Sequence, residues 1–280
     1  MTDATAHQPQ HVRIRPPRRW SGLGVRDLWE YRELAYFLAK RDVQVRYKQT
    51  ALGALWAIAQ PLVLTFIFAL ILGRVVSIET GGLPYFLVAL TGVTVWTFVS
   101  SATTGAAGSL VADANLLSKV YFPRLLLPLA KVTALLVDAV IAVVLMVVIA
   151  AAWGHPPELA TLTLPLFLLL AFVATVAIGI LASTVNVRYR DVMAVMPLAV
   201  LIWMFITPVA YPGSLISETW QLIYAINPVA TAINGVRFAV LGTEAPALDQ
   251  IAISIGVTLV LLVSGVIAFR RNEAEFADVI

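Results

Sequence analysis

The feature that most constrains this chain is a series of long apolar segments separated by short polar ones. A helix needs about 20 apolar residues to cross the roughly 30 Å hydrocarbon core of a bilayer. Five segments meet this requirement, namely 55–76, 125–153, 162–185, 193–211 and 251–269. Backbone groups in hydrocarbon must find partners within the protein, so isolated spans of this kind are helical. The sequence therefore predicts an all-α integral membrane protein.

A sixth segment, 83–107, is apolar but rich in hydroxyl groups and glycine. Small residues let helix backbones approach closely, and Ser or Thr can bond across a helix interface. We therefore count it as a sixth transmembrane helix that faces protein or a pore, on the strength of Thr91, Gly92, Thr94, Thr97, Ser100, Ser101, Thr103, Thr104 and Gly105. Only 12% of the 280 residues are charged, about half the proportion in soluble domains, which agrees with a membrane fold.

The positive charges indicate the orientation of the six spans. Ten of the 19 Lys and Arg residues lie in 1–54, and two each lie in 108–124, in 186–192 and after Phe269. These four segments share one side of the membrane, and the positive-inside rule places that side, with both termini, in the cytoplasm. The basic excess is thus topological, and we predict no nucleic-acid partner.

The segment before the first span divides into two parts. Residues 1–27 are polar, basic and proline-containing, which predicts a disordered cytoplasmic leader. In 28–54 apolar residues recur at helical spacing among basic ones, which predicts an amphipathic helix on the anionic inner leaflet. The alternative is a basic flank that only fixes topology.

Residues 213–249 are neither a plain loop nor a clean span. The apolar part is interrupted by Asn227-Pro228, Asn234-Gly235 and Arg237, which disfavour one straight helix. We predict two short re-entrant helices before the last span, because non-helical backbone at membrane depth survives only inside protein or beside a wet cavity. Asn227, Pro228, Asn234 and Arg237 are candidates for an extracytoplasmic gate. An ordinary extracytoplasmic loop is the alternative.

No motif for ATP hydrolysis or other catalysis occurs in the chain. It contains no GxxxxGK[ST] loop, no GxSxG elbow, no HExxH pair and no Cys, and its three His residues are scattered. We therefore predict no catalytic, cofactor-binding or metal-binding residue. An active pump of this kind needs an ion gradient or a separate ATPase that binds ATP and Mg.

Two charged residues lie inside the spans. Lys131 and Asp138 are seven residues apart, which puts them on one helix face about 10 Å from each other, too far for a simple direct pair. Lys131 can extend toward the cytoplasmic surface, whereas Asp138 needs a partner inside the protein. Asp138 is a contact in the substrate conduit or an interhelical hydrogen bond that fixes packing.

Two short cytoplasmic loops, 111–124 and 186–192, contain aromatic residues that plain turns do not need. The first can form a short helix, with Asp113 or Asn115 as its cap and Pro123 at its end. Such elements suit docking into a groove of a soluble motor. The candidates for ATPase coupling are Asn115, Lys119, Tyr121, Arg188, Tyr189, Arg190 and Asp191. The alternative is that their charges only hold the topology.

A series of short motifs resembles the permeases of ABC type-2 polysaccharide exporters. In order they are VQVRYK at 43–48, LWAIAQP at 55–61, FPRL at 122–125, NVRYRD at 186–191, TPVAYP at 207–212, NP at 227–228 and FADVI at 276–280. The resemblance covers residues 30–280. It implies a homodimer of six-helix subunits with two copies of a separate ABC ATPase in the bacterial cytoplasmic membrane. It further implies that a lipid-linked glycan, such as O-antigen, capsule, teichoic acid or cell-wall galactan, is exported.

Aromatic residues inside the spans are candidates for the glycan conduit. Trp96, Phe98, Trp203 and Phe205, together with Asp138, can contact sugar rings, although core packing and lipid contact are the alternatives. Two other functions compete with glycan export. The same scaffold can export a drug or small lipid, and a membrane transferase or ion-coupled carrier needs no motor. The last class predicts a cluster of carboxylates or His near one interface, and the sequence contains none.

Overall fold

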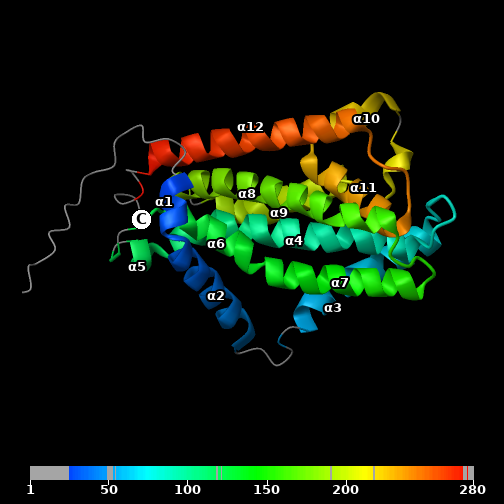
Figure 1. The fold of residues 1–280 in the computed structure, drawn as a ribbon, viewed down its shortest axis with the longest axis horizontal. Coiled ribbons are helices and arrows are strands. Elements are labelled where there is room, and N and C mark those ends of the chain that lie inside the picture. The colour runs from blue at the N-terminus through cyan, green and yellow to red at the C-terminus, as the bar shows by residue number, and fades with distance from the viewer. Residues whose placement is uncertain are drawn as a thin grey trace, which may run out of the picture.

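Every regular element of the described chain is a helix, which confirms the predicted all-α fold (Figure 1). The computed structural model describes residues 25–48, 53, 55–117, 119–120, 122–189, 191–216, 218–273 and 276. The predicted disorder of residues 1–24 lies outside these residues and stays a prediction, whereas residues 25–27 of the predicted leader are helical, so that end of the prediction is wrong.

Five helical segments are long and apolar enough to span a membrane. They run along the long axis of the molecule (Figure 1). They are α3 with η1 (Leu55–Phe68 and Ala69–Val75), α4 (Tyr85–Ala112), α6 with α7 (Leu126–Ala134 and Leu136–Ala152), η2 with α8 (Leu159–Thr163 and Leu164–Arg188), and α12 (Leu248–Asn272). We call the end of the bundle with α5 (Ala114–Leu117) the α5 end, and the end with α10 (Glu218–Tyr224) the α10 end.

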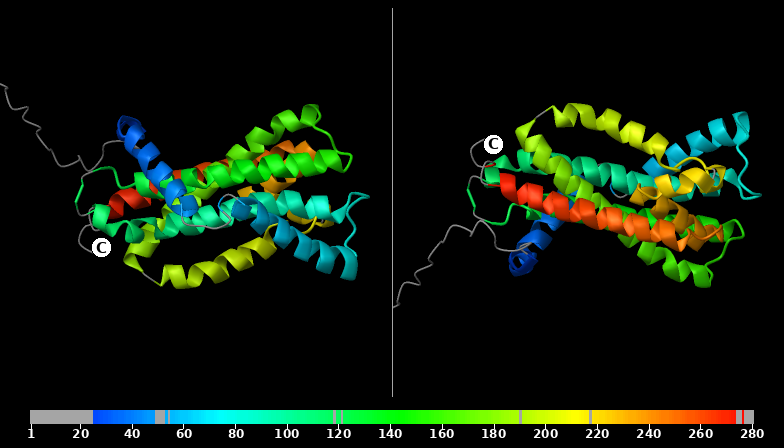
Figure 2. Two further views of the ribbon diagram at one scale, coloured as in Figure 1. Left: turned by 90° about the horizontal axis from the view of Figure 1, so that it is seen from below. Right: turned by 90° about the horizontal axis from the view of Figure 1, so that it is seen from above.

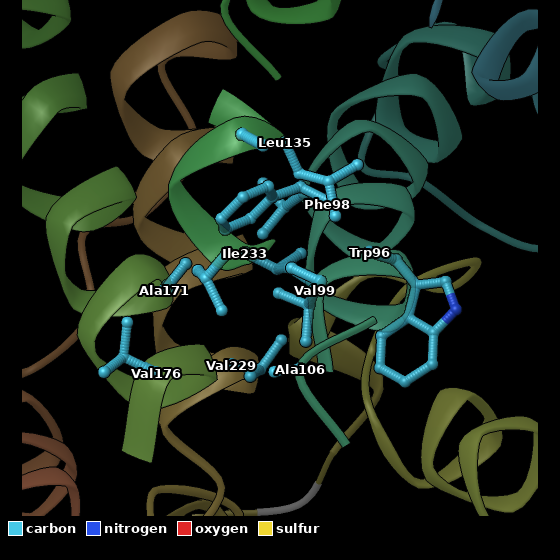
Figure 3. Packing of buried hydrophobic residues seen from close by; sticks show 14 of the residues in the cluster. Trp96, Phe98, Val99, Ala106, Leu135, Ala171, Val176, Val229 and Ile233 are labelled. Atoms are coloured by element: carbon cyan, nitrogen blue, oxygen red, sulfur yellow. The ribbon is translucent and has the colours of Figure 1, made fainter. Parts of the chain in front are cut away.

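Helix α4, the predicted hydroxyl-rich span, is the centre of the bundle. Of its most apolar window 72% is buried, against 11% for α3 and 17% for α12. Its small residues allow close packing: a methyl group at Gly179 of α8 would lie only 2.7 Å from Cβ of Ala106 on α4. Figure 3 shows the apolar core that results, with Phe98 and Val99 of α4 beside Leu135 and Ile233. The prediction that this span faces protein is confirmed.

Two predicted helices are divided in the structure. In place of the single predicted helix in 28–54 there are two helices separated at Tyr31: α1 (Val25–Glu30), which begins three residues earlier than predicted, and α2 (Arg32–Lys48). The span 125–153 is divided at Leu135, whose N–H donates to Val132 O at 3.2 Å. This is one turn of the tighter 3₁₀ type, so α6 and α7 continue as one span.

The predicted span 193–211 is helical only in its first part. Helix α9 covers Val192–Ile206, 15 residues, or about 22 Å at 1.5 Å per residue. Thr207 is extended, with φ −91° and ψ 139°, because the proline that follows disfavours helical backbone at the residue before it. Figure 2 shows α9 bowed away from the bundle between its ends. The N–H of Thr207 still donates to Trp203 O at 3.0 Å, and residues 208–212 complete this segment as non-helical chain.

The segment before the last span forms the two short helices that the sequence predicts. After the 3₁₀ turn η3 (Gly213–Leu215) come α10 and then α11 (Pro228–Leu241), which ends at Gly242 in the left-handed conformation with φ 66°. Helix α11 packs against α4 and α8, and twelve of its residues are buried. An ordinary exposed loop would not be buried in this way, so the alternative interpretation of this segment is wrong.

Candidate functional site

Arg237 of α11 lies inside the bundle and holds the non-helical segment that follows α9. The residue is 3% exposed. Its Nη2 donates to Val209 O at 2.8 Å, and its Nη1 donates to Tyr211 O at 2.9 Å. Nε and Nη2 also donate to Val88 O of α4, at 3.3 and 3.2 Å. The guanidinium therefore supplies the N–H donors that this backbone loses where the helix ends.

Asn227 joins the start of α11 to the end of α9. Its Oδ1 accepts from the backbone N–H of Val229, which makes it the N-cap of α11, and from Nε1 of Trp203, each at 3.3 Å. Its Nδ2 donates to Oγ1 of Thr207 at 2.8 Å. The side chain of Asn227 thus fixes both the end of α9 and the start of α11.

The four predicted gate residues lie at one site. Pro228 is the first residue of α11, where its missing N–H costs nothing. Asn234 Oδ1 accepts from Arg237 Nη1 at 3.4 Å. Tyr85 reaches the same segment from α4, because its hydroxyl donates to Ala210 O at 2.5 Å. At the α10 end, α4 and α11 therefore enclose the non-helical segment 207–212. A gate at this position would open only if these hydrogen bonds broke.

A group of four charges joins three elements at the α5 end. Arg41 of α2 lies 2.9 Å from Asp113, which follows α4, and 3.1 Å from Asp42. Lys131 of α6 lies 3.0 Å from Asp42 and 3.7 Å from Asp113. Each cation thus contacts both carboxylates. We call Arg41, Asp42, Asp113 and Lys131 the charge network.

The charge network is partly shielded from water, which strengthens it. The side chains of Asp42 and Asp113 are 12% and 14% exposed. Desolvation lowers the pKa of Arg41, but the hydrogen bond and charge of Asp42 and those of Asp113 outweigh it and raise this pKa above its ordinary value. Arg41 therefore stays charged, and α2 is tied to the bundle by paired charges as well as by its apolar residues.

Asp138 of α7 is bound by the last turn of α2. Arg46 Nη1 lies 2.5 Å from one carboxylate oxygen, and the Tyr47 hydroxyl donates to the other. Burial, followed by the bond and charge of Asp138, raises the pKa of Tyr47 to about 12, so the hydroxyl keeps its proton and remains a donor. Asp138 thus makes the interhelical bond that was one of its two predicted roles. Lys131 and Asp138 each pair with a different part of α2.

The candidate conduit residues lie in three different environments. Trp96 and Trp203 pack edge to face with ring centroids 5.3 Å apart, and Trp96 is buried. Phe98 stacks on Phe172 at 6.5 Å and projects from another side of α4 than Trp96 does (Figure 3). Phe205 is 65% exposed on α9. Phe98 and Asp138 line a common cavity, which the other three residues do not. The structure does not gather the five into one conduit.

The candidate coupling residues with described side chains are all exposed. These are Asn115, Lys119, Arg188, Tyr189 and Asp191, whereas Tyr121 and Arg190 lie outside the described residues. The guanidinium of Arg188 lies over the Tyr189 ring at 5.7 Å. At the first loop α4 continues to Ala112, and among the described residues from 113 to 124 only Ala114–Leu117 is helical. At the second, α8 continues to Arg188 and α9 begins at Val192. The two loops are therefore shorter than the predicted 111–124 and 186–192.

Sequence reasoning missed the polar contacts of several residues. The sequence indicated no partner for Arg41 or Asp42, and Asp113 was a candidate only for capping a helix. Asn186, the first residue of the second loop as predicted, is buried at the end of α8 and donates to Ala107 O of α4 at 3.0 Å. The sequence does place two cations and two carboxylates near the ends of predicted helices. Which of them form pairs depends on how α2 packs against the bundle.

Comparison with known proteins identifies the family. A family model described as ABC-2 type transporter matches residues 33–241. The O-antigen export system permease protein RfbA of Myxococcus xanthus is 28% identical over 256 residues, covering 91% of this chain and 98% of the relative. Two Klebsiella pneumoniae proteins of the same name are 27% and 26% identical over 249 residues, covering 89% of this chain and 95% of each relative. The match extends from α2 through the charge network to the end of α11, and the chain therefore belongs to the ABC-2 type transporter family.

Proposed function

We propose that this chain is the permease subunit of an ATP-driven exporter that moves a lipid-linked polysaccharide across the bacterial cytoplasmic membrane. The observation that carries the proposal is the similarity over nearly the whole length of the chain to three permeases named for O-antigen export. The absence of a phosphate-binding loop from the sequence supports a separate ATPase. ATP and Mg would bind that partner, and this chain is expected to bind no cofactor itself.

The exposed faces of the molecule support an arrangement of the complex. The exposed loop residues at the α5 end would contact the ATPase, of which a homodimer would bind two copies. Helices α3 and α9 have few buried residues and large exposed apolar side chains, such as Phe66 and Phe205. A second copy of the chain would cover part of these faces, so that the glycan passes between two protomers.

Export is tested by deleting the gene and complementing the strain. We expect loss of cell-surface glycan on deletion and its return with the wild-type gene. The purified chain alone should hydrolyse no ATP, whereas the chain co-purified with its ATPase should. Normal surface glycan in the deletion strain, with accumulation of another exported compound, would contradict the glycan assignment.

The proposed orientation makes a separate prediction. The chain has no native Cys, so one introduced thiol reports one position. In intact cells, an impermeant thiol reagent should label Glu79→Cys at the α10 end, and should label Lys119→Cys at the α5 end only after lysis. Both residues are exposed. Labelling of the two positions in the opposite order, or equally, would contradict cytoplasmic placement of the α5 end.

A further inference from the structure

A cavity of about 350 Å³ lies between the last turn of α2, the first turns of α3 and α7, and the middle of α4. Its lining includes Arg46, Trp56, Gln60, Thr94, Phe98 and Asp138. This volume is at the lower end of the range for small-molecule sites. The lining combines aromatic rings with amide, hydroxyl and carboxylate groups.

Thr94 lines this cavity with a buried polar group that the described part of the chain leaves unpaired. The residue is 2% exposed, and its hydroxyl has no hydrogen-bond partner among the described residues. The hydroxyls of its helix neighbours Thr91 and Thr97 bond to Val88 O at 2.9 Å and Val93 O at 2.8 Å. A buried hydroxyl without a partner is destabilising, and a ligand hydroxyl would satisfy that of Thr94.

The charges of the lining select the chemical class of the ligand. Arg46, the one cation among the described lining residues, is already paired with Asp138 at 2.5 Å. The pair is neutral as a whole, so neither an anion nor a cation finds an unpaired counter-charge. The remaining groups, a Gln60 amide and hydroxyls, donate and accept hydrogen bonds without charge. Such a lining suits a neutral molecule with several hydroxyl groups.

Trp56 adds an apolar surface to this polar lining. The residue is 55% exposed and stands at the start of α3. One face of a sugar ring carries mostly C–H groups, which pack on an aromatic ring, while the hydroxyls around the ring need donors and acceptors. An aromatic ring beside uncharged polar groups provides both kinds of contact.

We propose that this cavity is a sugar-binding site within a single protomer, with Trp56 as the platform for the ring and with Thr94, Gln60 and Asp138 as hydrogen-bond partners of its hydroxyls. The proposal rests on the proposed function and makes it more specific: part of the glycan contacts one protomer, beside α2. Of the predicted conduit residues only Phe98 and Asp138 line this cavity, and the roles of the other three stay predictions.

Binding is tested on the full chain purified with its ATPase and reconstituted in nanodiscs. Ser101, which lines the cavity, is replaced by Cys and modified with N-ethylmaleimide. The probes are octyl glucoside, galactoside, mannoside and rhamnoside, and the control amphiphile is octyl tri(ethylene glycol), which has the same tail and no sugar. At about ten times its Kd, a bound glycoside should slow modification about tenfold.

Three results of this assay would overturn the proposal. They are no slowing by any glycoside, equal slowing by octyl tri(ethylene glycol), and equal slowing at the exposed control position Thr133→Cys of α6. Trp56→Ala in the Ser101→Cys chain should abolish the protection. Protection that persists in that variant would remove Trp56 from the site and overturn the proposal as stated.

Glycan export in the complemented strain provides the second arm, with a matched pair of variants. Thr94→Val should lower surface glycan about threefold to tenfold, the loss expected for one hydrogen bond. Thr103→Val is the control, because Thr103 lies on the same helix, is equally buried and also lacks a hydroxyl partner among the described residues, but does not line the cavity. Equal export by both variants would overturn the proposal. If the wild-type gene restores no glycan, the proposed function fails, and the labelling assay still decides whether the cavity binds sugars.

Discussion

Replacing Arg237 with Ala is expected to lower the melting temperature of the purified permease by roughly 5–20 °C. The change leaves Val209 O and Tyr211 O in a buried site without their donor. An orphaned buried carbonyl costs about 1–3 kcal/mol, and about 1 kcal/mol corresponds to roughly 2–4 °C in a chain of this size. Thermal unfolding in one fixed detergent measures the shift.

Two further variants separate loss of the bonds from loss of a charge. Arg237→Lys keeps the charge but has one nitrogen instead of three, so it cannot bind all of the carbonyls and should melt between wild type and Arg237→Ala. Arg74→Ala also removes one positive charge near the α10 end, from an exposed side chain. It should change the free energy of unfolding by no more than about 0.5 kcal/mol. Equal melting temperatures for Arg74→Ala and Arg237→Ala would show that Arg237 does not hold the segment.

The same contacts explain how a short helix is compatible with a membrane span. Helix α9 is too short to cross the hydrocarbon core, and backbone groups beyond its end cannot bond to water there. Arg237 and Tyr85 donate to three consecutive carbonyls of the segment, those of Val209, Ala210 and Tyr211. A re-entrant helix is therefore needed at this position, because it carries the guanidinium to the depth of the break.

Much of the fold could be predicted because its determinants are local. Apolar length identifies the spans, and a proline identifies the end of α9, since Thr207 precedes it. The side chain of Asn227 and the adjacent proline mark the start of α11. These rules act over a few residues and require no knowledge of neighbouring helices. They failed at Leu135, where one turn tightens within an unbroken apolar sequence.

The candidate site was only partly predictable because its contacts join residues that are far apart in the chain. Residue type made Trp96, Phe98 and Phe205 equal candidates for the conduit. Their burial depends on how each helix is rotated about its own axis, and the sequence of a nearly uniformly apolar span does not fix that rotation. Gln60 and Thr94 were missed for the same reason. Lys131 and Asp138 each have a partner on α2, about 90 residues earlier in the chain, and no local rule connects residues so far apart.

Reversing the charge of Lys131 is expected to reduce glycan export at least about tenfold. Lys131→Glu places three carboxylates beside the single cation Arg41. Juxtaposed like charges at a partly buried site cost several kcal/mol. About 1.4 kcal/mol already corresponds to a tenfold change in an equilibrium constant. The repulsion should release α2 and the loop that follows α4 from α6. Surface glycan and the ATPase rate of the purified complex are the two measurements, and we expect ATP hydrolysis to continue while export falls.

Matched substitutions test whether the pairing of Lys131 is the cause. Lys131→Arg keeps the charge and should retain most export. Lys131→Gln leaves Asp42 and Asp113 to share Arg41, so its export should fall between that of Lys131→Arg and that of Lys131→Glu. Lys40→Glu is the control, because it makes the same charge change on an exposed side chain of α2 that lies over the Tyr36 ring at 5.9 Å and outside the charge network. An exposed charge contributes only about 0–1 kcal/mol, so Lys40→Glu should export nearly as wild type does. If Lys131→Glu and Lys40→Glu export equally well, the charge network does not hold α2 to the bundle during transport.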